Sequence, residues 1–180
     1  MAEHRQFASG IRFAVTPQSQ TELVLGAAAP ASTQETKLAT PWQCVVVSSE
    51  ATRCEALARA AAGGGWRTIR CRSAEAARAT TERMHCQLAI LDVEAASAGC
   101  DAEELRSLVE QLARENDLLL LVCGHERDPR EEIWARQLGV WLYLPGVIAG
   151  PELATLCGEA LDIAERLANR RDSQPLAKAM

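Results

Sequence analysis

The sequence is poor in lysine and aromatic residues, and it has no long apolar run. Only 4% of its 180 residues are aromatic, and residues 42–168 contain no lysine at all. A membrane-spanning helix needs roughly 18 or more consecutive apolar residues, and no such run is present. The first five residues also lack the apolar stretch of a secretory signal. We therefore expect a cytoplasmic protein without a membrane partner.

The cysteine pattern lacks the spacings of metal sites and disulfide frameworks. The seven cysteines form no CxxC pair and no Cys/His ligand set, and their number is odd. We expect free thiols in a reducing compartment and no metal site. Cys44, Cys71 and Cys123 fall within apolar runs, where a small buried residue is the simpler interpretation and a redox sensor the alternative.

Positive charge is not concentrated in the central part of the chain. Residues 42–168 hold 13 Arg against 20 Asp and Glu. An acidic body with scattered arginines offers no electrostatic footprint for DNA or RNA, so we expect no direct nucleic-acid binding. No glycine-rich phosphate-binding fingerprint follows the first apolar run, and a dinucleotide or Walker-type site is therefore not supported.

Composition divides the chain into a tail, a domain and a second short tail. Residues 1–41 mix Gln, Thr, Ser, Ala and Pro, and they hold too few apolar positions to fold alone. Two pieces of this tail, 11–15 and 23–25, alternate well enough to add a strand or dock in a groove. Residues 42–168 form the expected domain, and residues 169–180 form a polar C-terminal tail.

The expected domain alternates short apolar runs with helical stretches, which is typical of a parallel sheet covered by helices. The expected strands are residues 43–47, 67–71, 87–92, 118–123 and 140–144. The expected helices are residues 52–62, 73–83, 103–115, 128–138 and 151–169, with Asp101 as the N-cap of the third. The sequence therefore predicts an α/β fold: a five-stranded, doubly wound parallel sheet in three layers, flavodoxin-like in its arrangement.

Ligand sites in doubly wound sheets lie at the carboxyl ends of the strands. In this sequence those ends carry Ser48, Ser49, Glu50, Arg72, Asp92, Glu94, Cys123, His125 and Gly146. A lone acid, Asp92, ends the third apolar run. His125 has the chemistry of a general base, although a loop histidine that caps the next helix is the simpler interpretation.

Three segments together resemble the receiver domain of bacterial two-component response regulators. Residues 45–50, Val-Val-Val-Ser-Ser-Glu, stand where that family has a strand ending in acids. Residues 88–93, Leu-Ala-Ile-Leu-Asp-Val, read like the strand that ends in the phosphoaccepting aspartate. Residues 135–145, followed by 150–153, resemble the family's Gly-Ala, Tyr-Leu, Lys-Pro and Glu-Leu ending. The resemblance covers residues 42–168 and implies the receiver fold.

The resemblance also implies a role for several positions, and most of them depart from the family's pattern. Asp92 corresponds to the phosphoacceptor, Tyr143 to the aromatic switch residue and Cys123 to the Ser/Thr switch residue. The remaining correspondences are Ser48 and Ser49 at the acid positions, Gly146 at the lysine and Val147 at the proline. Two neutral hydroxyls are poor ligands for Mg²⁺, even if Glu50 or Glu94 reaches in. The lysine is absent, and the nearest candidate cation is Arg72.

We therefore expect a pseudo-receiver: a non-enzymatic signalling module without a cofactor, which regulates through protein contacts and lacks Mg-dependent aspartyl phosphorylation. The alternative is an atypical but active receiver that is phosphorylated on Asp92 with Mg²⁺. A third interpretation is a small enzyme that uses Asp92, His125 or Cys123 on an unrecognised substrate.

The expected partner is a protein of a signalling pathway, and a second copy of the chain is one candidate. The resemblance implies that such a homodimer would form through the fourth helix, the fifth strand and the fifth helix. The residues expected on that face are Glu131, Trp134, Trp141, Tyr143, Ala154, Leu161 and Arg166. Tryptophan and tyrosine often anchor interfaces, although for Trp134 or Trp141 taken singly packing in the core is the favoured interpretation.

Overall fold

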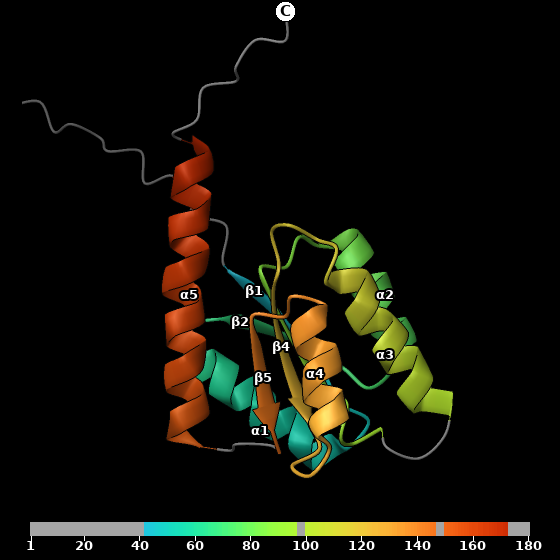
Figure 1. The fold of residues 1–180 in the computed structure, drawn as a ribbon. Coiled ribbons are helices and arrows are strands. Elements are labelled where there is room, and N and C mark those ends of the chain that lie inside the picture. Colours follow the sequence, from blue (N-terminus) through green and yellow to red (C-terminus); the bar gives the residue numbers. More distant parts are fainter. Residues whose placement is uncertain (1–41, 97–99, 147–149, 173–180) are drawn as a thin grey trace, which may run out of the picture. The chain divides into compact units, whose positions relative to one another are not determined.

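The computed structural model of the chain describes residues 42–96, 100–146 and 150–172 (Figure 1). These residues form strands and helices that alternate along the sequence. The strands are β1 (Gln43–Val47), β2 (Arg67–Cys71), β3 (Leu88–Asp92), β4 (Leu119–Gly124) and β5 (Leu142–Pro145). The helices are α1 (Ala51–Gly63), α2 (Ala74–Arg83), α3 (Cys100–Leu112), α4 (Pro129–Gln137) and α5 (Pro151–Asp172). Residues 11–15 and 23–25 and Val147 lie outside the described residues.

The strands form one sheet in the order β2-β1-β3-β4-β5, and every pairing is parallel. This confirms the predicted five-stranded, doubly wound α/β fold. The order reverses between β1 and β3, and their carboxyl ends lie together because Val47 pairs with Leu91. A reversal of this kind is where open parallel sheets form their ligand sites. The sheet therefore brings Ser48 and Asp92 to one point of its edge.

Helices cover both faces of the sheet (Figure 1). Successive strand residues point to opposite faces, so Val45 and Val47 join the core beneath α2, α3 and α4. Cys44 and Val46 instead join the core beneath α1 and α5. Burial on both faces explains why the central strands are unbroken apolar runs. No helix within the described residues is long and apolar enough to cross a membrane.

Side chains cap the starts of α2 and α4, as predicted, whereas the cap predicted for the third helix is wrong. Ser73 caps α2 by accepting a hydrogen bond from the Ala76 amide at 3.2 Å, and Asp128 caps α4 in the same way ahead of Pro129. The expected N-cap role of Asp101 is wrong, because α3 already begins at Cys100 and Asp101 lies within its first turn. An acid in that turn still interacts favourably with the helix dipole.

Strand β5 is shorter at its start than predicted. The sequence predicts that it begins at Val140, but the amide of Val140 still bonds the carbonyl of Ala135 in α4, at 3.4 Å. Gly139 makes this turn possible with a φ of 78°, in the left-handed region. The strand therefore begins at Leu142, while α5 extends past the expected end near residue 169 to Asp172.

Gly64 lies where the end of α1 meets α5. A Cβ atom there would come within 2.6 Å of Cys157 Cβ and 2.8 Å of the backbone of Cys157 and Gly158. Because a buried helix backbone cannot move aside cheaply, we expect Gly64→Ala to lower the free energy of unfolding by about 1–3 kcal/mol, measured by urea denaturation.

Gly63→Ala is the matched control for this substitution. Its Cβ would lie 3.4 Å from Ala154 Cβ, which is close to ordinary contact, and it would sit at the end of a helix. We expect an unchanged or slightly raised stability, by up to about 1 kcal/mol. Equal destabilisation by the two variants would contradict the close approach of α1 to α5.

Candidate functional site

The candidate site lies at the carboxyl ends of β1 and β3, where Ser48 and Asp92 meet. Asp92 is the last residue of β3, and 0% of its surface is exposed. Ser48, which is also buried, donates a hydrogen bond from Oγ to Asp92 Oδ2 at 2.8 Å. A carboxylate so deeply buried needs partners for both of its oxygens.

The main partner of Asp92 is Arg53, a residue of α1 that the sequence analysis did not single out. Arg53 Nε donates to Asp92 Oδ2 at 2.8 Å, and Nη2 donates to Oδ1 at 2.7 Å. This bidentate geometry is among the strongest arrangements available to a guanidinium and a carboxylate. The Ala95 amide also donates to Oδ1, at 3.2 Å, so each oxygen of Asp92 accepts two hydrogen bonds.

Two further acids hold Arg53 in place. Arg53 Nη2 donates to Glu94 Oε2 at 2.6 Å, and Glu50 Oε2 lies 3.8 Å from Arg53 Nε. The hydrogen bond to Asp92 is the largest effect on this guanidinium, and it raises the pKa of Arg53 above its ordinary value despite partial burial. Arg53 is therefore a permanent cation fixed against Asp92. We call Arg53, Asp92, Ser48 and Glu94 the Arg53 cluster.

The local sequence contains one clue to Arg53. A cation in the first turn of a helix opposes the helix dipole, and α1 has no acid in that turn to offset it. The first turn of α1 follows directly on Ser48 to Glu50, so it lies next to the ends of the strands. From this turn the side chain of Arg53 reaches Asp92, and this contact offsets the unfavourable interaction with the helix dipole. A basic residue there, close to a lone buried acid, is the pattern that indicates the ion pair.

Other residues of the predicted site point elsewhere. Ser49 Oγ donates to the carbonyl of Ala95 at 3.0 Å. Arg72, the expected nearest cation, donates instead to the main-chain carbonyls of Ser48 and Ser49. Gly146 has a φ of 76°, and its amide donates to the Gly124 carbonyl at 2.7 Å. These contacts shape the backbone around Asp92.

Cys123 lies directly beside Asp92 in the sheet, but its environment does not favour a reactive thiolate. It pairs with Asp92 in the β3–β4 register and is fully buried. Burial first, and then the negative charge of Asp92, raise the pKa of its thiol well above the ordinary value. The thiol therefore stays protonated, which does not suit a nucleophile. His125, the other candidate for catalysis, has its ring against Glu131, with Nδ1 3.3 Å from Oε2.

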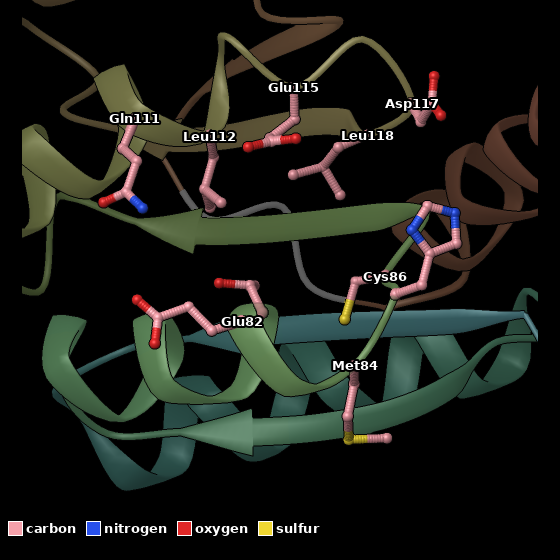
Figure 2. Close-up of a pocket in the computed structure, with 10 residues that line it drawn as sticks. Glu82, Met84, Cys86, Gln111, Leu112, Glu115, Asp117 and Leu118 are labelled. Carbon is pink, nitrogen blue, oxygen red and sulfur yellow. The ribbon is translucent and has the colours of Figure 1, made fainter.

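Pockets lie at both edges of the sheet: at the carboxyl edge one includes Ser49 and Arg72 and another Val93 and His125, and a further one lies at the amino edge. This amino-edge cavity has a volume of about 160 Å³ and lies at the amino ends of β3 and β4, between the last turns of α2 and α3; its lining residues are drawn in Figure 2. Its lining combines the acids Glu82, Glu115 and Asp117 with apolar side chains such as Met84 and Leu118. The length of β3 separates this cavity from Asp92.

Solved structures with the same architecture include response regulator receiver domains. A CheY-like response regulator receiver domain from Methanospirillum hungatei matches 71% of this chain and 98% of its own, with 14% identity and a TM-score of 0.60. The chain has the receiver fold. NtrX from Brucella abortus, solved in complex with ATP, matches over 78% of this chain but 32% of its own, with 15% identity and a TM-score of 0.62. A pilus assembly-related protein from Burkholderia pseudomallei matches at 23% identity and a TM-score of 0.53 over 69% of this chain and 90% of its own.

No family model and no curated protein matches the sequence. The likeness to solved structures therefore shows the fold alone. The receiver fold confirms the predicted architecture, while the domain bounds of 42–168 and the roles assigned to Ser48, Ser49, Asp92, Cys123, Tyr143 and Gly146 stay predictions.

The receiver resemblance implies a magnesium site, and the residues at this edge do not fit one. Mg²⁺ prefers several carboxylate or water oxygens in octahedral geometry. The buried carboxylate here, Asp92, already accepts four hydrogen bonds, and its neighbour Ser48 is a donor toward it. Within the described residues, no group of three His, Cys, Asp or Glu is placed to hold a metal. The carboxylate oxygens at this edge are instead arranged to accept hydrogen bonds from the Arg53 guanidinium.

Two residues expected on an exposed interface face are buried. Glu131 is 2% exposed and Tyr143 is 8% exposed, and the two side chains bond to one another: Tyr143 Oη donates to Glu131 Oε1 at 3.0 Å. Trp134 is half-buried, with the Arg106 guanidinium 5.5 Å from its ring centre. Trp141 is also half-buried and packs against the core beneath α1 and α5. Both tryptophans thus belong partly to the core.

Removing Arg53 tests the energetic importance of the ion pair. Arg53→Met leaves the Asp92 carboxylate buried without its cation, and losing one partner of a fully buried pair costs roughly 3–5 kcal/mol. Because the side chain of Arg53 is 25% exposed, we expect a somewhat smaller loss of about 2–4 kcal/mol in urea denaturation at neutral pH. The double variant Arg53→Met/Asp92→Asn should recover part of this loss.

Arg59→Met is the control on the same helix. Arg59 is an exposed residue, 3.8 Å from Glu55, and such surface pairs contribute little. We expect a change below about 0.5 kcal/mol. A loss for Arg53→Met as small as that for Arg59→Met, or no recovery in the double variant, would show that the Asp92 carboxylate does not depend on Arg53.

Proposed function

We propose that the chain is a cytoplasmic, non-enzymatic signalling module: a pseudo-receiver that regulates through protein contacts and does not accept a phosphoryl group on Asp92. The observation that carries this proposal is the bidentate contact of Arg53 with both oxygens of the fully buried Asp92. The receiver fold supports the signalling role, and the Arg53 cluster supports the loss of chemistry.

The ion pair opposes phosphorylation through geometry and through charge. An aspartate that accepts a phosphoryl group needs an oxygen lone pair open to in-line approach, and catalysis of this transfer is mostly positioning and charge neutralisation. Here the lone pairs of Asp92 are directed at Arg53, Ser48 and Ala95. A phosphoryl donor would have to displace the guanidinium and would then meet Glu94 and Glu50, whose negative charges repel it.

Protein contacts are the function that the receiver fold retains without this chemistry. The α4, β5 and α5 face remains the candidate surface, and a second copy of the chain remains a candidate partner. Ile133 on α4 is 56% exposed, the largest exposure of a bulky apolar side chain among the described residues. A single exposed apolar side chain is common on protein surfaces, so the choice of this face rests on the receiver fold.

A direct phosphorylation assay tests the proposal. The full chain is incubated with Mg²⁺ and acetyl phosphate and then examined by intact-protein mass spectrometry at low temperature, beside a receiver domain known to react. We expect no phosphoryl adduct on the wild type and none on Asp92→Asn. Magnesium-dependent addition in the wild type that disappears in Asp92→Asn would overturn the proposal and establish the active-receiver alternative.

A further inference from the structure

A second buried carboxylate, Glu131 of α4, has no part in the Arg53 cluster. Its Oε1 accepts from the His125 amide at 2.8 Å and from Tyr143 Oη at 3.0 Å. Its Oε2 accepts from Arg106 Nη2 at 3.1 Å and lies 3.3 Å from His125 Nδ1. These donors come from α3, from β5 and from the turn after β4, so Glu131 joins three separate segments to α4.

The backbone is shaped to admit this contact. Gly124 ends β4, and a Cβ atom there would lie 2.1 Å from Glu131 Oε1 and 2.2 Å from Tyr143 Oη. Any other residue would displace the carboxylate, the hydroxyl or both. The meeting of Glu131 and Tyr143 therefore depends on a glycine that leaves room for it.

The environment of Tyr143 keeps its hydroxyl in the donor form. Burial first, and then the hydrogen bond to Glu131 and the charges of Glu131, Asp128 and Glu132, raise the pKa of Tyr143 far above its ordinary value. A neutral phenol keeps donating to the carboxylate over the whole physiological pH range. Turning this side chain outward would remove one donor from a buried carboxylate and open a void beside Gly124, and both changes cost free energy.

We propose that Glu131 is an internal lock: it holds Tyr143 inward and ties α4 to α3, β4 and β5, so that the chain itself keeps this corner of the domain in one conformation. The lock does not depend on the proposed function, because Glu131, Tyr143, His125 and Arg106 share no residue with the Arg53 cluster. It acts on the α4 and β5 surface whether or not Asp92 is ever modified.

Tyr143 is the only tyrosine of the chain, so its ionisation can be followed by ultraviolet absorbance without assignment. In the wild type we expect the phenol to ionise well above the ordinary value of about 10, or only as the protein unfolds in alkali. Far-UV circular dichroism, recorded on the same samples, separates these two events. Glu131→Gln removes the neighbouring negative charge, and we expect ionisation of the folded protein to shift down by roughly one pH unit or more.

Glu132→Gln is the matched control. Glu132 is the next residue of the same helix, but its carboxylate binds Arg136 and has a weaker effect on Tyr143. We expect a clearly smaller shift. The lock is overturned if wild-type Tyr143 ionises near 10 in the folded protein, or if the two variants shift its ionisation equally.

Amide hydrogen exchange gives a second measurement. A change of charge next to Tyr143 would alter its ionisation but would not by itself change the exchange rates of backbone amides. Glu131→Gln and Tyr143→Phe should each speed amide exchange in residues 124–137 by roughly tenfold, with little change in β1. Tyr143→Phe removes only the hydroxyl group and leaves the aromatic ring and the Glu131 carboxylate in place. It therefore tests the lock even if Glu131→Gln does not fold. Unchanged exchange in residues 124–137 of folded Tyr143→Phe would contradict the inference.

Discussion

A carboxylate buried at the edge of a parallel sheet must be neutralised, and the rest of this site follows from how Asp92 meets that requirement. Arg53 supplies the positive charge from the first turn of α1, and Ser48 and the Ala95 amide complete the hydrogen bonding. Because Arg53 already neutralises Asp92, that carboxylate needs neither a metal ion held by acids after β1 nor a lysine after β5. The Arg53–Asp92 ion pair is therefore consistent with Ser48 and Ser49 at the acid positions and Gly146 at the lysine position.

Asp92 and Glu131 are the two buried acids among the described residues, and each binds an arginine. Asp92 binds Arg53 and Glu131 binds Arg106, and the last residues of β4 contribute to both sites. Cys123 lies beside Asp92 in the sheet, whereas Gly124 makes room for Glu131 and Tyr143. A guanidinium binds carboxylates through a planar fork of donors that lysine lacks, which suits a domain with 13 arginines and no lysine.

The fold could be predicted from the sequence because its causes are local. Apolar runs with caps such as Ser73 and Asp128 fix each strand and helix almost alone, and short right-handed connections then determine the sheet. The site could be predicted only in part. Asp92 and Ser48 follow from strand ends, but Arg53 lies 39 residues from Asp92, and nothing in helical periodicity reveals where its side chain points. Glu131 was expected on an exposed face because the receiver resemblance implies an interface there, and its burial depends on donors from three other segments.

The most direct measurement of the central claim is a crystal structure grown with Mg²⁺ and beryllofluoride, a mimic of the phosphoryl group. The account predicts that Arg53 Nε and Nη2 remain within hydrogen-bonding distance of the two Asp92 oxygens, with neither metal nor beryllium bound there. A beryllofluoride adduct on Asp92, with Mg²⁺ beside it and the Arg53 guanidinium turned out to solvent, would contradict the account.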